Sequence, residues 1–380
     1  MTQNPKKANA VGKFFSELGW KLKQGTRAFN RGVEKYLPFL TNWPHWLKAI
    51  IYLLPAMILL SIFTFYPIIN SFLVSFYEGY GFDFQEGAWL YDNVTLFGNY
   101  SYVIAQQDFG QAILNTFYMA IITVPLSVII GLLIAVAMTS IKSLRGVYQS
   151  VFFLPYVTNS IALGLVFAFM FKNNGNELQL YFDWVANGSQ AGMEPQMSFG
   201  LVNQILVWLG GKPVVWLGSG SLGGGVMGAT YITALSVILV YTIWNGLAFK
   251  IIVFMAGIEG IDKQYYQAAQ IDGASKFKTF MRITVPLISP MIFYILITSM
   301  IGAFKAYSSI VAIIGTTGTI TSGAEPINLK TIVFYIYDYL QFATTPGYLS
   351  YAAAASIILF GIILVFTLLQ FIAGKKRVHY

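Results

Sequence analysis

The chain of 380 residues contains no cysteine and only two histidines, His45 and His379. Without thiols it can form neither disulfides nor thiolate metal sites. Both histidines lie outside the long apolar runs, so a histidine metal site or an intramembrane proton relay is not expected. The sequence has no G-x-x-x-x-G-K-[ST] phosphate loop, and its Gly/Ser-rich stretch 218–225 contains no Lys-Ser or Lys-Thr. We therefore expect no metal site, no cofactor and no ATP hydrolysis in this chain.

Charged residues are also scarce, at 10% of the chain, whereas 56% of the residues are hydrophobic and 17% are aromatic. This is the composition of a polytopic membrane protein. A spanning helix needs roughly 20 mostly apolar residues. We therefore predict an all-α polytopic membrane protein with six transmembrane helices and no cleavable signal peptide. The predicted spans are 49–72, 113–139, 148–171, 229–249, 287–313 and 350–373.

The basic residues are unevenly distributed between the loops. Of the 23 Lys and Arg residues, 19 lie in four segments that alternate with the other loops: 1–48, 140–147, 250–286 and 374–380. Because cytoplasmic loops carry the excess of Lys and Arg, we expect both termini and the loop after the fourth span to be cytoplasmic. The formal net charge of +8 is then explained by topology, and nucleic-acid binding is not expected.

A polar segment separates the fourth and fifth predicted spans and reads QAAQIDGASKFKTFMRITVPLISP over 267–290. Its first residues favour a short helix, which Gly273 is expected to end, because glycine readily adopts the left-handed conformation found after helix C-termini. A second helical segment is expected from Ala274. Pro286 then suits the first turn of the next membrane helix. This arrangement predicts a docking element in water, although a loop that merely connects two helices is the alternative.

The same segment resembles the cytoplasmic-loop signature of permease subunits of binding-protein-dependent ABC importers. That signature is Glu-Ala-Ala, three residues, Gly, nine residues, Ile, one residue and Leu-Pro, and this chain has Gln for Glu and Val for Leu. The sequences at 97–100, 115–116, 200–203, 216–217 and 331–337 are similar to the sugar, maltose-type branch of that family. The resemblance implies the type I permease fold of ABC importers.

The resemblance further implies an ATP-driven importer of a carbohydrate that works by alternating access. The implied partners are a second homologous permease, two cytoplasmic ATPase subunits and an extracytoplasmic solute-binding protein. The chain itself would be a non-catalytic subunit in the cell membrane, in contact with lipid, and ATP and Mg would be used by the partner ATPase. The residues implied in ATPase coupling are Gln267, Ala268, Ala269, Asp272, Gly273, Ile283 and Pro286.

Candidates for the solute path are polar or aromatic side chains in or near the spans, because aromatic faces and amides bind sugars. They could equally be interfacial aromatics and helix-to-helix hydrogen bonds. Lys305 is the only formal charge in the fifth span, which makes it a candidate functional residue, although it could also reach the interface. Lys250 follows the fourth span, where it is expected to extend to the membrane surface. The solute-path candidates are Asn115, Tyr241, Trp244, Asn245, Lys305 and Tyr307.

The predicted organisation has four parts. A basic arm either lies on the anionic leaflet or is a solvated tail. The first span and an external loop follow, and then a core of five spans with an external insertion at 173–228 and a docking loop at 259–286. Within the insertion, 173–197 is polar and 199–210 has the spacing of an amphipathic helix on the outer membrane face. The parts are 1–47, 48–112, 113–373 and a cytoplasmic tail at 374–380.

Three alternatives remain at this stage. An ABC permease could carry glycerol phosphate, a polyamine or a peptide instead of a sugar. An ion-coupled secondary transporter would commonly have Asp, Glu or His at mid-membrane, and the predicted spans contain none. A membrane-embedded enzyme would need a nucleophile with a base or a cluster of metal ligands, and the sequence offers neither pattern.

Overall fold

The computed structural model describes residues 44–83, 88–141, 145–172, 200–218, 229–322, 325–342 and 345–375. Nearly all of the basic arm, the polar part of the insertion and most of the C-terminal tail lie outside these residues. The chain divides into two units, Met1–Ser71 and Phe72–Tyr380. Four helices of the described part are long and apolar enough to cross a membrane, and two bent pairs bring the number to six if each pair is one span. This agrees with the six predicted spans.

The described part of the first unit is an apolar helix that continues to Val74. α2 (His45–Leu60) passes through a π-helical turn, η2 (Ser61–Phe65), into α3 (Tyr66–Val74). The π turn ends two residues before Pro67. Pro67 has no N–H to donate to the carbonyl four residues earlier, and such a gap favours a local change of helical pitch. The 29 residues Trp46–Val74 correspond to the first predicted span.

Two small antiparallel ribbons follow α3. β1 (Tyr77–Glu78) pairs with β4 (Asn93–Val94), and β2 (Gly81–Asp83) pairs with β3 (Ala88–Leu90). α4 (Gly98–Ala105) comes next. The buried amide of Asn99 donates to the carbonyls of Ser75 and Tyr77 at 2.9 and 3.0 Å. These bonds hold the start of α4 against the end of the preceding helix.

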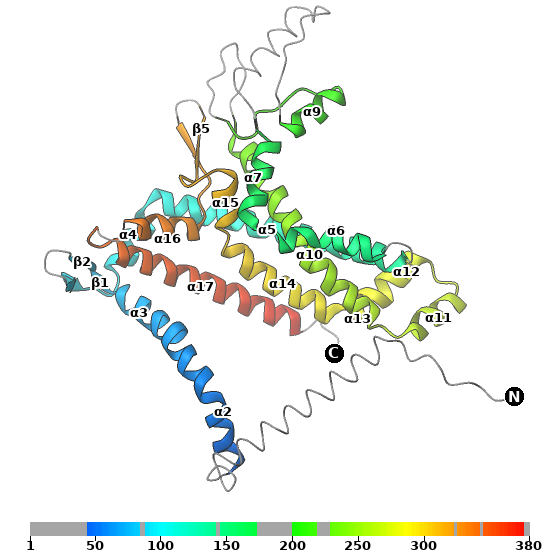
Figure 1. Cartoon of the computed structure of the whole chain (residues 1–380), viewed down its shortest axis with the longest axis horizontal. Coiled ribbons are helices and arrows are strands. Elements are labelled where there is room, and N and C mark those ends of the chain that lie inside the picture. Colours follow the sequence, from blue (N-terminus) through cyan, green and yellow to red (C-terminus); the bar gives the residue numbers. More distant parts are fainter. Residues whose placement is uncertain are drawn as a thin grey trace, which may run out of the picture. The chain divides into compact units, whose positions relative to one another are not determined.

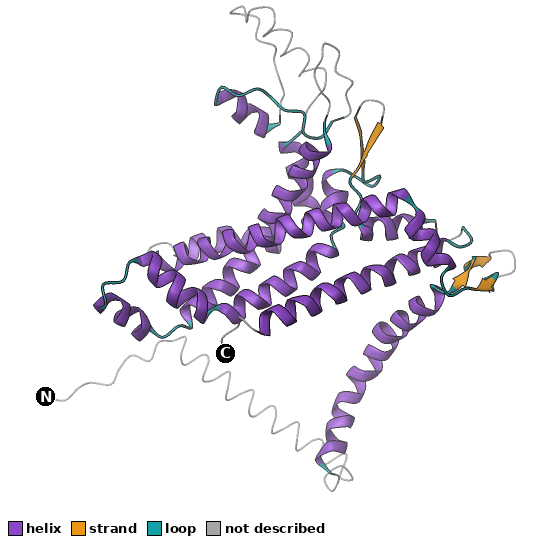
Figure 2. Cartoon of the chain, turned by 180° about the vertical axis from the view of Figure 1, so that it is seen from behind, coloured by secondary structure: helices purple, strands orange, loops and turns teal. Residues whose placement is uncertain are grey.

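The core of the second unit is built from long helices that lie side by side. α5 (Gln107–Ser140) packs along α10 (Tyr231–Glu259) and α14 (Ser289–Phe304), and α17 (Tyr348–Lys375) packs on α14 and α16 (Ile332–Gln341), as Figures 1 and 2 show. Four consecutive alanines of α17, at 352–355, are buried. Small side chains let helix backbones approach closely, which suits the packing of α17 on its neighbours.

The third predicted span is not one continuous helix. α6 (Arg145–Val157) and α7 (Ser160–Met170) are separated by two residues and bent by 99°. Pro155 near the end of α6 removes a helical hydrogen bond, and the Asn159 side chain accepts from the N–H groups of Ile161 and Ala162, which begins a new helix. The predicted span at 148–171 therefore consists of two helices and not of one.

The fifth predicted span is also divided. The segment Lys276–Leu287 bends by 68° into α14, and α14 ends before Lys305. A separate helix, α15 (Ser308–Ile313), then packs on α7. The fourth span is longer than predicted, because α10 continues to Glu259 instead of ending near residue 249.

Shorter elements connect these helices. The predicted amphipathic helix within the insertion is confirmed as α9 (Leu201–Trp208), and the Asn203 amide ties it to Val214 and to the Trp216 indole. β5 (Thr319–Ser322) and β6 (Glu325–Asn328) form an antiparallel hairpin before α16. The docking loop forms α11 (Lys263–Ile271), α12 (Lys276–Thr279), a π turn η4 (Phe280–Thr284) and α13 (Val285–Leu287).

Candidate functional site

The elements from α11 to α13, residues 263–287, form what we call the coupling segment. α11 begins at the Asp262 cap, whose side chain accepts from the Gln264 N–H at 3.0 Å. It ends where Gly273 adopts a positive φ of 67° and its N–H donates to the Gln270 carbonyl. The predicted helix stop at Gly273 is therefore confirmed. Ser275 then accepts from the Lys278 N–H and starts α12, so the segment turns without a long loop.

The two faces of α11 differ in exposure. Ala269 is buried, at 6% exposure. Gln267, Ala268 and Asp272 are exposed, and a Cβ atom at Gly273 would meet nothing within 4 Å. The sequence reasoning missed two large apolar side chains beside them, Ile271 at 87% exposure and Phe277 at 72%. Apolar side chains exposed on a polar segment are available for contact with another protein.

The coupling segment is connected to the membrane helices at its base. The Tyr266 hydroxyl and the buried Thr284 hydroxyl lie 3.1 Å apart and form a hydrogen bond between α11 and η4. Ile283 and Pro286 are half-buried on the segment that leads into α14. A cavity of about 930 Å³ separates α11 and α12 from the ends of α5 and α10. The segment is therefore held at its base and leaves room on its inner side.

A second polar feature lies where α6 and α7 are bent. A cleft of about 480 Å³ opens between this bend, α10 and α14, and we call it the polar cleft. Asn245 is the solute-path candidate that lines it. The bend contributes a helix break and three residues with hydroxyl groups, α10 contributes an amide and an ammonium, and α14 contributes two further residues with hydroxyl groups. Its lining residues are Pro155, Tyr156, Thr158, Ser160, Asn245, Gly246, Phe249, Lys250, Thr298 and Ser299.

Lys250 is the charged residue of the polar cleft. It is 7% exposed, and its Nζ donates to the Gly246 carbonyl at 3.1 Å. The sequence predicted that Lys250 would extend to the membrane surface, whereas the structure buries its ammonium inside the chain, and α10 continues nine residues beyond it. Two glycines make room for it: a Cβ at Gly131 would lie 3.1 Å from the Lys250 Cβ, and one at Gly246 would lie 2.9 Å from Nζ. This packing across helices carries no signal in the sequence around residue 250.

The remaining solute-path candidates lie in other places. Asn115 is fully buried and donates to the carbonyls of Asn328 and Lys330 at 3.1 and 2.8 Å. It accepts from the Tyr231 hydroxyl at 2.7 Å and from the Gln111 amide at 3.0 Å. Its amide thus joins α5, α10 and the chain after β6 and has no hydrogen-bonding capacity left for a solute.

Tyr241, Trp244, Lys305 and Tyr307 do not form one surface with Asn115. Tyr241 is buried and donates to the Ser160 carbonyl behind the polar cleft, and Trp244 packs on the Phe167 ring at 5.1 Å. Lys305 is exposed at the end of α14, and Tyr307 stacks on Tyr337 at 4.3 Å. We infer that Tyr241 and Trp244 support the wall of the polar cleft.

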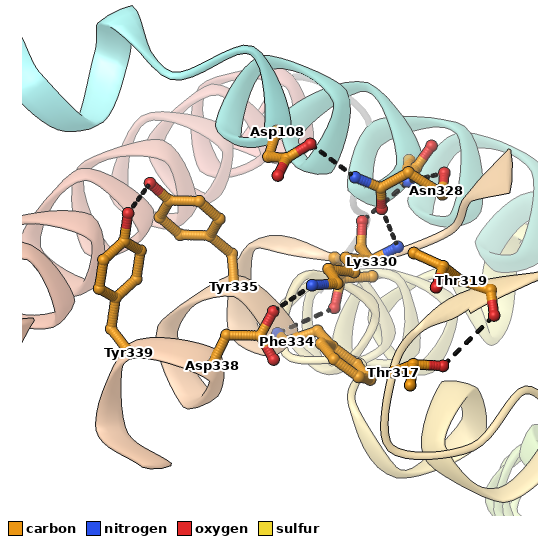
Figure 3. Close-up of polar contacts among 11 residues, drawn as sticks. Asp108, Thr317, Thr319, Asn328, Lys330, Phe334, Tyr335, Asp338 and Tyr339 are labelled. Carbon is orange, nitrogen blue, oxygen red and sulfur yellow. Dashed lines mark hydrogen bonds and ion pairs between the residues drawn. The ribbon is translucent and has the colours of Figure 1, made fainter. Parts of the chain in front are cut away.

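A polar network joins the start of α5 to α16 (Figure 3). The Asn328 amide donates to Asp108 at 3.1 Å and accepts from the Lys330 N–H at 3.0 Å. Lys330 forms an ion pair with Asp338. Burial raises the pKa of the Asp338 carboxyl although Lys330 acts in the opposite direction. These contacts fix the β5–β6 hairpin to α5 and α16. None of them involves the coupling segment.

With this geometry established, comparison with known proteins identifies the family. Residues 95–378 match the family described as the binding-protein-dependent transport system inner membrane component. The chain belongs to this family. It is therefore the permease component of a binding-protein-dependent transport system and crosses the membrane several times.

Several permeases of this family resemble the chain over most of its length. The lactose transport system permease protein LacF of Rhizobium radiobacter is 28% identical, with 86% of this chain and 94% of LacF covered. The arabinooligosaccharides transport system permease protein AraP of Bacillus subtilis is 27% identical, with 85% and 88% covered. The trehalose/maltose transport system permease protein MalF of Thermococcus litoralis is 25% identical, with 86% and 92% covered.

The fold is also found in solved permease structures. A chain in the crystal structure of a bacterial ABC transporter that imports the acidic polysaccharide alginate has a TM-score of 0.63 and 22% identity, with 88% of this chain and 96% of that chain covered. A chain of the alginate transporter in complex with an alginate pentasaccharide-bound periplasmic protein has a TM-score of 0.62 and 22% identity. These likenesses confirm the predicted permease fold.

Proposed function

We propose that this permease is the membrane-spanning subunit of an ATP-driven importer of a carbohydrate. The relatives named above are named for lactose, arabinooligosaccharides, and trehalose or maltose, which supports a saccharide as the solute. The coupling segment supports the proposal that import is driven by ATP. In this segment, exposed apolar side chains are joined by a short, hydrogen-bonded connection to a membrane helix.

In this proposal the coupling segment binds a partner on its exposed side. We infer that the exposed residues Ala268, Ile271, Gly273 and Phe277 contact a cytoplasmic ATPase, which binds ATP and Mg. Gln267 and Asp272 border this surface, and Ala269 is buried. Ile283 and Pro286 set the direction of the chain as it enters α14. The complete importer in this proposal has two ATPases, a second permease and an extracytoplasmic solute-binding protein.

The orientation follows from the same segment. Lys263, Lys276, Lys278 and Arg282 concentrate positive charge in the coupling segment, which supports its placement in the cytoplasm together with both termini. The opposite ends of the helices, with α9 and the β5–β6 hairpin, would then face the solute-binding protein. Labelling of single cysteines introduced into this cysteine-free chain tests the orientation directly.

The solute would pass along the polar cleft. The Tyr156 and Phe249 rings lie nearly parallel there, 6.0 Å apart, beside the Asn245 amide. Aromatic faces with an amide nearby are suited to sugar rings. Asn115 would keep the helices in register, while the exposed Lys305 and the stacked Tyr307, at the far end of α14, would border the entrance. The second permease would complete the path.

Copurification and reconstitution test this proposal. The permease is coexpressed with its companion permease and ATPase, purified through a tag on this chain, and placed in liposomes. We expect ATPase activity that rises when a saccharide-loaded solute-binding protein is added, and uptake of that saccharide. A permease that purifies without any ATPase contradicts the proposal. So does an ATPase activity that stays unchanged with every loaded solute-binding protein.

A further inference from the structure

We propose that Lys250 makes the polar cleft selective for an anionic group on the solute, so that the importer carries an acidic saccharide such as one containing uronic acid. This inference rests on the proposed function and names its solute class. Three observations carry it: the burial of the ammonium, the donors that it leaves without acceptors, and the hydroxyls that surround it.

Lys250 is buried within its helix bundle and well before the end of its helix. α10 continues nine residues beyond it, to Glu259, which corresponds to about 13 to 14 Å along the helix. Its Nζ is directed back to the Gly246 carbonyl of the same helix. Burial of an ammonium in a membrane protein is unfavourable without compensation. Such residues mark functional sites.

Its hydrogen bonding is incomplete. An ammonium has three N–H donors, and within the described residues Lys250 uses one, to the Gly246 carbonyl of its own helix. The lining of the polar cleft contains no Asp or Glu among the described residues. An anionic group of a bound solute would supply the missing acceptors and the missing charge. Gly131 and Gly246 leave the space in which the side chain lies.

The other polar groups of the cleft fit the sugar part of such a solute. The Thr158 hydroxyl donates to the Leu154 carbonyl at 2.8 Å, and the Thr298 hydroxyl donates to the Tyr294 carbonyl at 2.9 Å. Because these protons are committed to the helices, both oxygens are left as acceptors for the hydroxyl groups of a saccharide. Together with one ammonium, they suit a polyhydroxylated anion better than a small inorganic one.

The first experiment uses the absence of cysteine in this chain. Ser160→Cys places a single thiol in the polar cleft of the complete importer in membrane vesicles. The rate of labelling by a thiol reagent is then measured with digalacturonate, with maltose as a neutral disaccharide of the same length, and with inorganic phosphate. We expect digalacturonate to protect the thiol at concentrations roughly tenfold to a hundredfold below those of the other two.

The second experiment removes the charge. In the Ser160→Cys background, K250M should raise the concentration of digalacturonate needed for protection by about tenfold or more. The concentration of maltose needed for protection should stay nearly unchanged. K250R keeps the charge and should keep the preference for the acid. K212M is the matched control, because it removes one positive charge at an exposed residue outside the cleft and should change neither value.

The outcomes separate this inference from the proposed function. If maltose protects as well as digalacturonate while Lys250 is present, or if K250M leaves their ratio unchanged, Lys250 does not select an anion. An importer that still couples ATP hydrolysis to uptake of a neutral saccharide would then retain the proposed function without this inference. Protection by phosphate as strong as that by digalacturonate would also overturn the assignment to a saccharide.

Discussion

Gly273→Asp tests whether the exposed turn between α11 and α12 in the coupling segment contacts an ATPase. Gly273 has a φ of 67°, where an ordinary L-residue is disfavoured by roughly 1–2 kcal/mol, although Asp tolerates this region better than most residues. The new Cβ would meet no atom of this chain within 4 Å. The backbone effect is therefore too small to prevent membrane insertion of the permease.

The larger effect is expected at the interface with the partner. A carboxylate buried without a counter-charge between two proteins costs about 2–5 kcal/mol, which weakens association by about thirtyfold or more. We therefore expect Gly273→Asp to be present in the membrane at normal amounts, to copurify with little or no ATPase, and to show no uptake. Immunoblotting of membranes, copurification and transport by vesicles measure the three quantities.

Gly210→Asp is the matched control. Gly210 follows α9 with a φ of 81°, and a Cβ there would also meet nothing within 4 Å. The two substitutions thus impose a similar backbone strain and the same charge, but only one lies in the coupling segment. If Gly273→Asp kept coupled transport, or if Gly210→Asp lost ATPase association to the same extent, the assignment of the ATPase contact to the turn at Gly273 would be refuted.

Three further substitutions test the other contacts. Ile271→Ser should weaken ATPase association by about tenfold or more in copurification, because burying one isoleucine contributes roughly 1.5–3 kcal/mol, whereas Ile232→Ser, at an exposed site on α10, should not. Asn115→Ala leaves the Tyr231 hydroxyl and two carbonyls without their partner and should lower stability by about 1–3 kcal/mol, measured as earlier thermal unfolding in detergent. Asn159→Ala removes the cap of α7 and should cost about 0.5–2 kcal/mol in the same assay, while Thr158→Ala at the neighbouring position leaves the cap in place.

The sequence was sufficient to predict the number of spans and the turn at Gly273. Long apolar runs must form helices in a membrane because backbone groups have no other partners there. The bends were not predicted, since run length carries no information on direction, although Pro155 followed by Asn159-Ser160 was a usable signal for a helix end and a new cap. The burial of Lys250 could not be predicted, because it depends on Gly131, which is more than a hundred residues away in the sequence.

The two candidate sites are connected by one helix, and this gives the proposed coupling a physical route. Tyr266 and Thr284 fasten α11 to the turn that leads into α14. α14 begins at Ser289 and carries Thr298 and Ser299 in the wall of the polar cleft, about 14 Å further along. Because a helix of 16 residues moves as a rigid element, displacement of its first turn by the coupling segment must also displace this wall. The facing wall lies at the bend between α6 and α7, where Asn159 begins a separate helix. In the proposed coupling, displacement of α14 against this wall changes the width of the cleft.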